Sequence, residues 1–319
     1  MIDLPHFDPN NPRVLVTGAA GLLGRHIVRE LLSMGLQVRG MDLRTAPEEI
    51  EWHVGDITDA ASVKQAVAGC FAVVHAAARP NIWSGDGDDI LRINTLGAWN
   101  VFKACDEAGI RRVVFCSSDS VVGYTVAEGA MVPPDYLPVD LDHPLRATDP
   151  YALSKILGED IGRSFAYRGM EVIALRTVFV AYPEMECEIL ARAADPANYR
   201  GRMAGGPSSA GGGPLHNHID PRDLARAFGL ALRMERPGTP ACPFEAIFLA
   251  AESTLSPEPT VERFKRLHGP DVDVRDPGLY AANPYASLYD LRPARERLGF
   301  VPRYCKRYLI ENGAAAPAK

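Results

Sequence analysis

The stretch Gly18-Ala-Ala-Gly21-Leu-Leu-Gly24 separates a short aliphatic run from an amphipathic segment. Its glycines permit a tight turn and let a phosphate group approach the N-terminus of a helix, where free N–H groups favour an anion. The glycines fall at every third residue, which differs from the common GxGxxG spacing. A simple strand-to-helix turn is the alternative interpretation. We expect Gly18, Gly21, Leu22, Leu23 and Gly24 to bind the pyrophosphate of a dinucleotide.

From about residue 13 to residue 176, short β-branched runs alternate with amphipathic stretches on both sides of this loop. Such alternation is typical of a parallel sheet covered by helices on both faces. Apolar residues recur at helical spacing between Leu23 and Leu32, and Gly35 is expected to end that helix. Strands are predicted at residues 14–17, 37–42, 52–54, 72–75, 113–116 and 172–175. The pattern predicts an α/β protein with a Rossmann-type, doubly wound parallel sheet.

Acidic and small residues follow the predicted second, third and fourth strands. Asp42 can accept hydrogen bonds from the adenosine ribose and would repel a 2′-phosphate, which favours NAD over NADP. Arg44 lies close enough in sequence to serve a phosphate instead, so NADP stays an alternative. Asp56 is expected to accept from the adenine amino group, with an exposed loop carboxylate as the alternative. Ile57 is a further cofactor candidate, as are the small residues Ala76, Ala77 and Ala78 after His75, where the backbone must pass close to a flat cofactor. The expected cofactor contacts also include Asn94, Tyr151 and Lys155.

The sequence pattern loosens after Arg176 into Pro- and Gly-rich sequence, including residues 201–214, and a helix is predicted at 223–234. We expect residues 1–176 to form an NAD-binding domain that carries the catalytic residues. Residues 177–319 are expected to form a smaller, mainly substrate-binding region, with 223–250 returning to the first domain. The last residues, after Asn312, are expected to be disordered.

Tyr151-Ala-Leu-Ser-Lys155 begins a predicted helix, and its i,i+4 spacing places the phenol and the ammonium group on one face. A free tyrosine has a pKa of ~10, but a neighbouring Lys155 cation favours the phenolate and makes Tyr151 a competent proton acceptor. Ser118, Asp119 and Ser120 follow the fifth predicted strand, at the sheet edge where open α/β folds bind ligands. We expect Ser118, Tyr151 and Lys155 to be catalytic, and Ser118, Asp119 and Ser120 to contact substrate.

The composition excludes several classes of function. With 34 Lys+Arg against 40 Asp+Glu, the chain lacks the clustered positive charge that nucleic-acid binding needs. No signal-like N-terminus and no long apolar run is found, so we expect a cytoplasmic protein without a membrane partner. The six cysteines are scattered and show no CxxC spacing, so neither a disulfide framework nor a metal site is predicted.

These motifs together resemble the extended short-chain dehydrogenase/reductase family, which includes the NAD-dependent epimerases and dehydratases. The resemblance extends over nearly the whole chain and also includes the segments 94–97, 289–292 and 298–302. It implies NAD as cofactor, catalysis by Ser118, Tyr151 and Lys155, and contact between Lys155 and the nicotinamide ribose. It further implies that Asn94 supports the active-site helix. Homodimers formed through helices near residues 90–108 and 150–167 are also implied.

The family's common mechanism is hydride transfer between a secondary alcohol carbon and nicotinamide. The chain lacks the Asn that nucleotide-sugar epimerases carry after the Arg176 position, and Gly123-Tyr124 is similar to members that oxidise free sugars or sugar acids. We therefore expect an NAD-dependent dehydrogenase acting on a small polyhydroxylated substrate, with Arg176, His216 and His218 as further substrate contacts. Arg176 could instead only support the sheet, and the two histidines could lie in a surface loop. A nucleotide-sugar 4-epimerase is the first alternative, a dehydratase the second, and a non-catalytic nucleotide-binding regulator the third.

Overall fold

The computed structural model describes residues 13–124, 132–194 and 217–312 of the chain. Its main feature is a seven-stranded sheet in which every strand pair is parallel, in the order β10-β7-β5-β4-β1-β2-β3. The strands are β1 (Arg13–Thr17), β2 (Gln37–Asp42), β3 (Glu51–Val54), β4 (Ala72–His75), β5 (Arg112–Ser118), β7 (Glu171–Thr177) and β10 (Phe244–Leu249).

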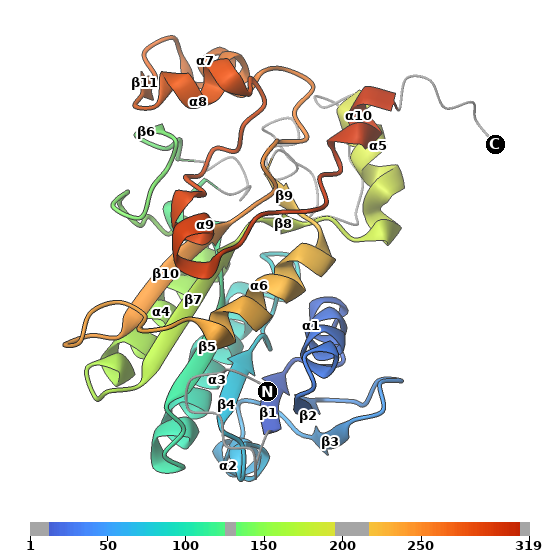
Figure 1. The fold of residues 1–319 in the computed structure, drawn as a ribbon, viewed down its shortest axis with the longest axis vertical. Coiled ribbons are helices and arrows are strands. Elements are labelled where there is room, and N and C mark those ends of the chain that lie inside the picture. The colour runs from blue at the N-terminus through green and yellow to red at the C-terminus, as the bar shows by residue number, and fades with distance from the viewer. Residues whose placement is uncertain (1–12, 125–131, 195–216, 313–319) are drawn as a thin grey trace.

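Helices cover both faces of this sheet, each packing an apolar stripe against it (Figure 1). One face carries α1 (Leu22–Ser33) and α6 (Pro221–Arg233), and the other carries α2 (Ala60–Val67), α3 (Gly87–Glu107) and α4 (Pro150–Ala166). Ile27, Leu31 and Phe228 are fully buried on the first face, and Phe102 and Phe165 on the second. The predicted α/β, Rossmann-type doubly wound fold is confirmed.

The six strands predicted from the sequence match β1 to β5 and β7, with ends that differ by no more than a few residues. The first helix is also found where the apolar spacing places it, and Gly35 follows it with a φ of +80°, a left-handed conformation that glycine adopts without strain. Leu32 departs from the expected apolar face because its side chain is 40% exposed. The seventh strand, β10, was not among the predicted strands.

The order of the strands places the loop after β1 at a crevice. The chain runs from β1 outward to β3, then crosses to β4 and continues in the opposite direction to β10. Parallel sheets bind ligands at such a reversal point, outside the carboxyl ends of the strands. The loop containing Gly18 and the ends of β4 and β5 therefore meet at one edge.

Smaller elements gather above that edge in Figure 1. Within the described part of the chain they include two short parallel strand pairs, β8 (Phe179–Val180) with β9 (His218–Ile219) and β6 (Tyr136–Leu137) with β11 (Asp273–Val274). The helical elements there are η2 (Pro183–Met185), α5 (Glu186–Ala194), α7 (Thr260–His268), α8 (Pro277–Ala282), α9 (Arg292–Leu298) and α10 (Arg307–Asn312). None of the described helices combines the length and the apolar character needed to span a membrane.

Candidate active site

The glycine loop packs so closely against its neighbours that side chains are excluded at two of its positions. Gly18 has a φ of +74°, and a Cβ there would lie 2.8 Å from the backbone of Ala77. A Cβ on Gly24 would lie 2.0 Å from the carbonyl oxygen of Gly18. At Gly21, which is the N-cap of α1, a Cβ would have only one close neighbour, the Gly18 carbonyl oxygen at 3.2 Å. The loop thus brings bare backbone and the free N–H groups of α1 to the crevice.

Asp42, at the end of β2, is fixed against this loop. Its carboxylate accepts hydrogen bonds from the Ala20 N–H at 3.0 Å and from the Leu43 N–H at 2.7 Å. Both bonds come from backbone groups, so the carboxylate keeps lone pairs for further donors such as ribose hydroxyls. Arg44 is exposed two residues further on.

The other cofactor candidates lie around the ends of β3 and β4. Asp56 is exposed and accepts from the Thr58 N–H at 2.8 Å, which fits the exposed loop carboxylate as well as an adenine contact. Ile57 is buried, and its carbonyl oxygen accepts from the Asn100 side chain at 2.9 Å. The backbone N–H of Ala77 donates to the Thr17 hydroxyl at 3.2 Å. Ala76, Ala77 and Ala78 are half-buried at the loop, while Leu22 is exposed and Leu23 packs partly into the core.

These residues fit a bound dinucleotide such as NAD. The loop leaves no room for side chains where a pyrophosphate would pass, and the N-terminus of α1 offers donors to it. Asp42 supplies the acceptor expected for a ribose. When NAD is bound, it accepts or returns a hydride.

Ser118, Tyr151 and Lys155 come together where β5 meets the start of α4. Asp149 caps α4 by accepting from the Ala152 N–H at 2.7 Å, and Pro150 occupies the first helical turn. Tyr151 is therefore presented at the beginning of the helix, where it shares a hydrogen bond with Ser118. Lys155 donates to the Cys116 carbonyl oxygen at 2.8 Å, and its Nζ lies 5.6 Å from the centroid of the Tyr151 ring.

Burial controls the protonation of this group. Burial raises the pKa of Tyr151, the nearby Cys116 adds to this effect, and the hydrogen bond shared with Ser118 opposes it. Burial also lowers the pKa of Lys155. His75, at the end of β4, is fully buried and hydrogen bonds with Thr17 at 2.7 Å, and burial followed by the Lys155 charge lowers its pKa to about 3. His75 is thus a neutral histidine with a hydrogen-bond partner inside the protein, which indicates a structural role.

The two adjacent serines are used differently. Ser117 donates its hydroxyl to the Glu159 carboxylate at 2.6 Å and is fully buried. Ser118 donates to Asp119 at 3.3 Å and accepts from the Ser120 N–H at 3.2 Å, so its oxygen stays near Tyr151. This geometry supports the choice of Ser118 over Ser117.

Asp119 connects the catalytic segment to the C-terminal part of the chain. Its second carboxylate oxygen accepts from the Tyr289 hydroxyl at 2.9 Å, and burial raises the pKa of Asp119 to about 6. The residue is half-buried, whereas Ser120 is almost fully buried beside it. Tyr289 was not predicted as a site residue, although it opens one of the quoted terminal motifs.

Asn94 joins α3 to α4. Its side-chain oxygen accepts from the Arg79 N–H at 2.7 Å, and its amide donates to the Ser154 hydroxyl at 2.9 Å. Ser154 directly precedes Lys155, so these bonds fix the helix that carries the catalytic candidates. The placement agrees with a supporting role for Asn94.

Arg176 does not face a substrate surface. Its guanidinium is buried and forms a two-pronged pair with Glu159, with N–O distances of 2.9 and 2.8 Å. The assignment to substrate binding is therefore corrected in favour of the supporting role, because both donors that point to a carboxylate already have one within the protein.

Of the two histidine candidates, only His218 lies within the described residues, and it differs from the expectation. His218 lies in β9, is fully buried, and accepts from the Lys306 N–H at 2.9 Å, so it is neither a surface-loop residue nor a group open to substrate. Burial lowers its pKa to about 3. His216 and the glycine-rich residues 201–214 lie outside the described residues.

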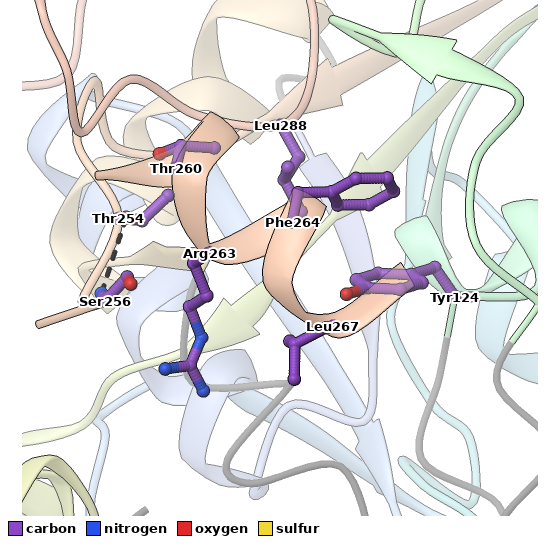
Figure 2. Close-up of a pocket in the computed structure, with 8 residues that line it drawn as sticks. All are labelled: Tyr124, Thr254, Ser256, Thr260, Arg263, Phe264, Leu267 and Leu288. Carbon is purple, nitrogen blue, oxygen red and sulfur yellow. Dashed lines mark hydrogen bonds between the residues drawn. The ribbon is translucent and has the colours of Figure 1, made fainter. Parts of the chain in front are cut away.

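A small pocket is lined by residues of α7, by Tyr124 and by Leu288, which directly precedes Tyr289 in the chain (Figure 2). The helix α7 contributes Phe264 and Leu267 to its apolar lining. Thr254, Ser256, Thr260 and Arg263 supply polar groups to its wall. The Tyr124 hydroxyl and His268 are 3.0 Å apart, which ties α7 to the segment that follows Ser118.

A family model described as the NAD dependent epimerase/dehydratase family matches residues 14–241. The chain is 30% identical over 243 residues to 2-alkyl-3-oxoalkanoate reductase of Stenotrophomonas maltophilia, which covers 75% of this chain and 70% of that protein. It is 34% identical over 174 residues to L-arabinose 1-dehydrogenase (NAD(P)(+)) of Haloferax volcanii, covering 51% of this chain and 65% of that protein.

Among solved structures, the chain is similar to a short-chain dehydrogenase/reductase superfamily protein from Agrobacterium tumefaciens with bound NAD. The TM-score is 0.68 at 26% identity, and the match covers 95% of this chain and 96% of that one. Several further curated relatives are matched over less than half of their own length.

Proposed function

We propose that this chain, which belongs to the NAD-dependent epimerase/dehydratase family, transfers a hydride between a secondary alcohol of a small polyhydroxylated substrate and NAD. The substrate class is a free sugar or a sugar acid, and Tyr151 is the general acid/base. The observation that supports this most is the meeting of Ser118, Tyr151 and Lys155 at the carboxyl end of β5.

Each of these residues has a distinct task in the proposed reaction. The Tyr151 phenolate takes the hydroxyl proton as the alcohol becomes a carbonyl, and returns it in the reverse direction. The Ser118 hydroxyl donates to the substrate oxygen and orients it. The Lys155 ammonium, held by the Cys116 carbonyl, lowers the cost of forming the phenolate in a buried setting.

The proposed cofactor contacts follow from the loop geometry. The backbone at Gly18, Gly21 and Gly24 would hold the pyrophosphate, and Asp42 would bind the adenosine ribose. Asp56 and Ile57 would border the adenine. Ala76 to Ala78 would pass beside the flat rings, and Lys155 would reach the nicotinamide ribose.

The substrate class rests on two arguments. An arabinose dehydrogenase is among the relatives, and the segment after Arg176 lacks the asparagine expected for a nucleotide sugar. We further assign residues 177–319 mainly to substrate binding. The elements α6 and β10 are exceptions because they pack in and beside the main sheet.

Two alternative activities differ from this proposal in their substrate. A nucleotide-sugar 4-epimerase is the first alternative, because the family includes such enzymes. An apolar 3-oxo acid is the second, because the relative from Stenotrophomonas maltophilia, matched over 243 residues, is a 2-alkyl-3-oxoalkanoate reductase.

The deciding experiment follows NADH spectroscopically while purified protein and NAD are offered free sugars, sugar acids, nucleotide sugars and a 3-hydroxy acid. Net NADH with a sugar or a sugar acid supports the proposal. Conversion of a nucleotide sugar to its epimer without net NADH would replace it with the epimerase. Turnover of the 3-hydroxy acid alone would replace the sugar class with an apolar one.

We also propose a homodimer formed through α3 and α4. Leu96, Trp99 and Leu153 are 39 to 44% exposed on these two helices, which is unusual for large apolar side chains on neighbouring elements. Sedimentation analysis of Trp99→Glu tests this arrangement. A wild-type monomer, or a Trp99→Glu variant that stays dimeric, would contradict it.

A further inference from the structure

Glu159 is a buried carboxylate with an unusual set of partners directly behind the catalytic candidates. Its side chain is 1% exposed and accepts hydrogen bonds from the Ser117 hydroxyl at 2.6 Å and from Arg176 at 2.9 and 2.8 Å. A buried ion pair is weak evidence for stability, because the cost of removing two charges from water can exceed their attraction. Stability alone therefore does not explain why this buried pair is present.

The residues that Glu159 and its helix contact are consecutive in β5. Lys155 bonds to the carbonyl of Cys116, and Glu159, one turn later in α4, bonds to the side chain of Ser117. Between them lies Gly158, where a Cβ would come within 2.5 Å of the Phe115 ring. The helix is thus attached to three successive residues that end immediately before Ser118.

Arg176 extends this attachment to the next strand. It lies in β7 directly opposite Ser117 in the parallel register, so its pair with Glu159 ties α4 to two adjacent strands at once. Its guanidinium also lies 5.1 Å from the Phe248 ring in β10, which stacks on Tyr289. The same group of contacts therefore reaches the residue that hydrogen bonds with Asp119.

We propose that Glu159 is a positioning residue, which locks α4 onto the ends of β5 and β7 and thereby sets the placement of Tyr151 and Lys155 relative to Ser118. The proposal rests on the proposed function for the identity of the catalytic residues. It adds a residue that touches neither substrate nor cofactor and acts only through its neighbours.

The Glu159 charge also affects the pKa of Lys155, which can be measured. It raises the pKa of Lys155 and so opposes the effect of burial, which lowers that pKa. The other titratable groups near Lys155 are Cys116 in β5, His75 in β4 and Tyr151 in α4, and Arg176 in β7 faces Glu159. Loss of the Glu159 charge should therefore lower the pKa of Lys155.

The main test variant replaces the whole pair, Glu159→Leu with Arg176→Met, because an apolar pair of similar volume avoids leaving one charge buried alone. We expect it to bind NAD like the wild type, while kcat falls about tenfold to a hundredfold through misplacement of the reacting groups. The alkaline limb of its kcat–pH profile should move to lower pH. Wild-type kcat with an unchanged profile would overturn the proposal.

Two further measurements cover the cases in which the pair variant fails to fold or no substrate is found. Ser117→Ala removes one bond to Glu159 and should lower kcat severalfold, whereas the control Ser164→Ala, on the exposed side of α4, should not. The Lys155 pKa, followed by NMR of 13Cε-labelled lysine and assigned with Lys155→Arg, needs no substrate. An equal Lys155 pKa in the wild type and in Glu159→Gln would overturn the proposal even if the proposed reaction itself fails.

Discussion

The region from β1 to β7 and the region after Thr177 are held together by different kinds of contact. The first consists mainly of parallel strands and amphipathic helices that pack through buried apolar side chains. Apart from α6 and β10, which pack in and beside the main sheet, the second has strands of two residues and relies on single polar bonds between distant segments, such as Asn217 with Leu288 and His218 with Lys306. Periodic burial builds the nucleotide-binding framework, whereas individual side chains position the C-terminal region on it.

The largest expected effect lies in the first region, at Tyr151. Tyr151→Phe removes the proton acceptor and should lower kcat by roughly a thousandfold, within the usual contribution of general acid–base catalysis. NAD binding should change little because the ring remains. Tyr167→Phe, at the exposed end of the same helix, is the control in the NADH assay. Full turnover by Tyr151→Phe would remove the assigned base.

A smaller effect is expected where the first region selects its cofactor. Asp42→Asn keeps an oxygen for the Ala20 N–H but removes the charge, so hydrogen bonds to the ribose weaken and repulsion of a 2′-phosphate disappears. The ratio of kcat/KM for NAD over NADP should fall about tenfold to a hundredfold. Asp160→Asn, an exposed change in α4, serves as the control. An unchanged ratio would contradict this role of Asp42 and would favour Arg44 as the residue that determines the cofactor preference.

The two regions should contribute alike to acid sensitivity, since burial lowers the pKa of one histidine in each region to about 3. Burial lowers the pKa of His75 and of His218 to about 3, below their ordinary value of 6.5. The unfolded chain therefore binds protons that the native protein does not, and this stabilisation is complete above pH 6.5 and lost as the pH falls towards 3.

At pH 5 the loss should reach about 2 kcal/mol per histidine. Urea unfolding of the wild type at pH 7 and pH 5 measures the sum, and His218→Gln should remove about half of the difference. A difference that His218→Gln leaves intact would mean that other groups cause the acid sensitivity.

The smallest effect is expected at the bond between the regions. Tyr289→Phe leaves the ring stack on Phe248 but removes the hydrogen bond to Asp119, which should cost about 1 to 2 kcal/mol of unfolding free energy. KM for substrate should rise while KM for NAD stays constant. The exposed Tyr308→Phe is the matched control. Equal changes in both KM values would show that Tyr289 acts on the whole fold.

The sequence was most informative where structure depends on periodicity and on glycine. The first six strands of the sheet, the helix after the loop and the joint placement of Tyr151 with Lys155 all follow from local patterns. The sequence places two adjacent serines at the end of the fifth strand, and the structure supplies the physical reason to choose Ser118, which is the bond from Ser117 to Glu159.

The sequence was least informative where a charged side chain finds a partner far along the chain. Arg176 looked like a substrate contact because nothing in the local pattern shows that Glu159, on another element, already pairs with it. Tyr289 and Asp119 are separated by 170 residues, so their bond could not be anticipated. Glu159 itself left a signal, since it lies four residues after Lys155 and hence on the same face of the helix.

The position of β10 limits how this protein can be divided. A chain cut after Thr177 would lose the strand that pairs with β7 from Phe244 to Leu249, and with it the helix α6 that covers one face of the sheet. It would expose an unpaired parallel edge and a broad apolar surface, both of which promote aggregation. The region after Thr177 therefore completes the nucleotide-binding framework as well as covering it, and truncated forms are unsuitable for cofactor-binding assays.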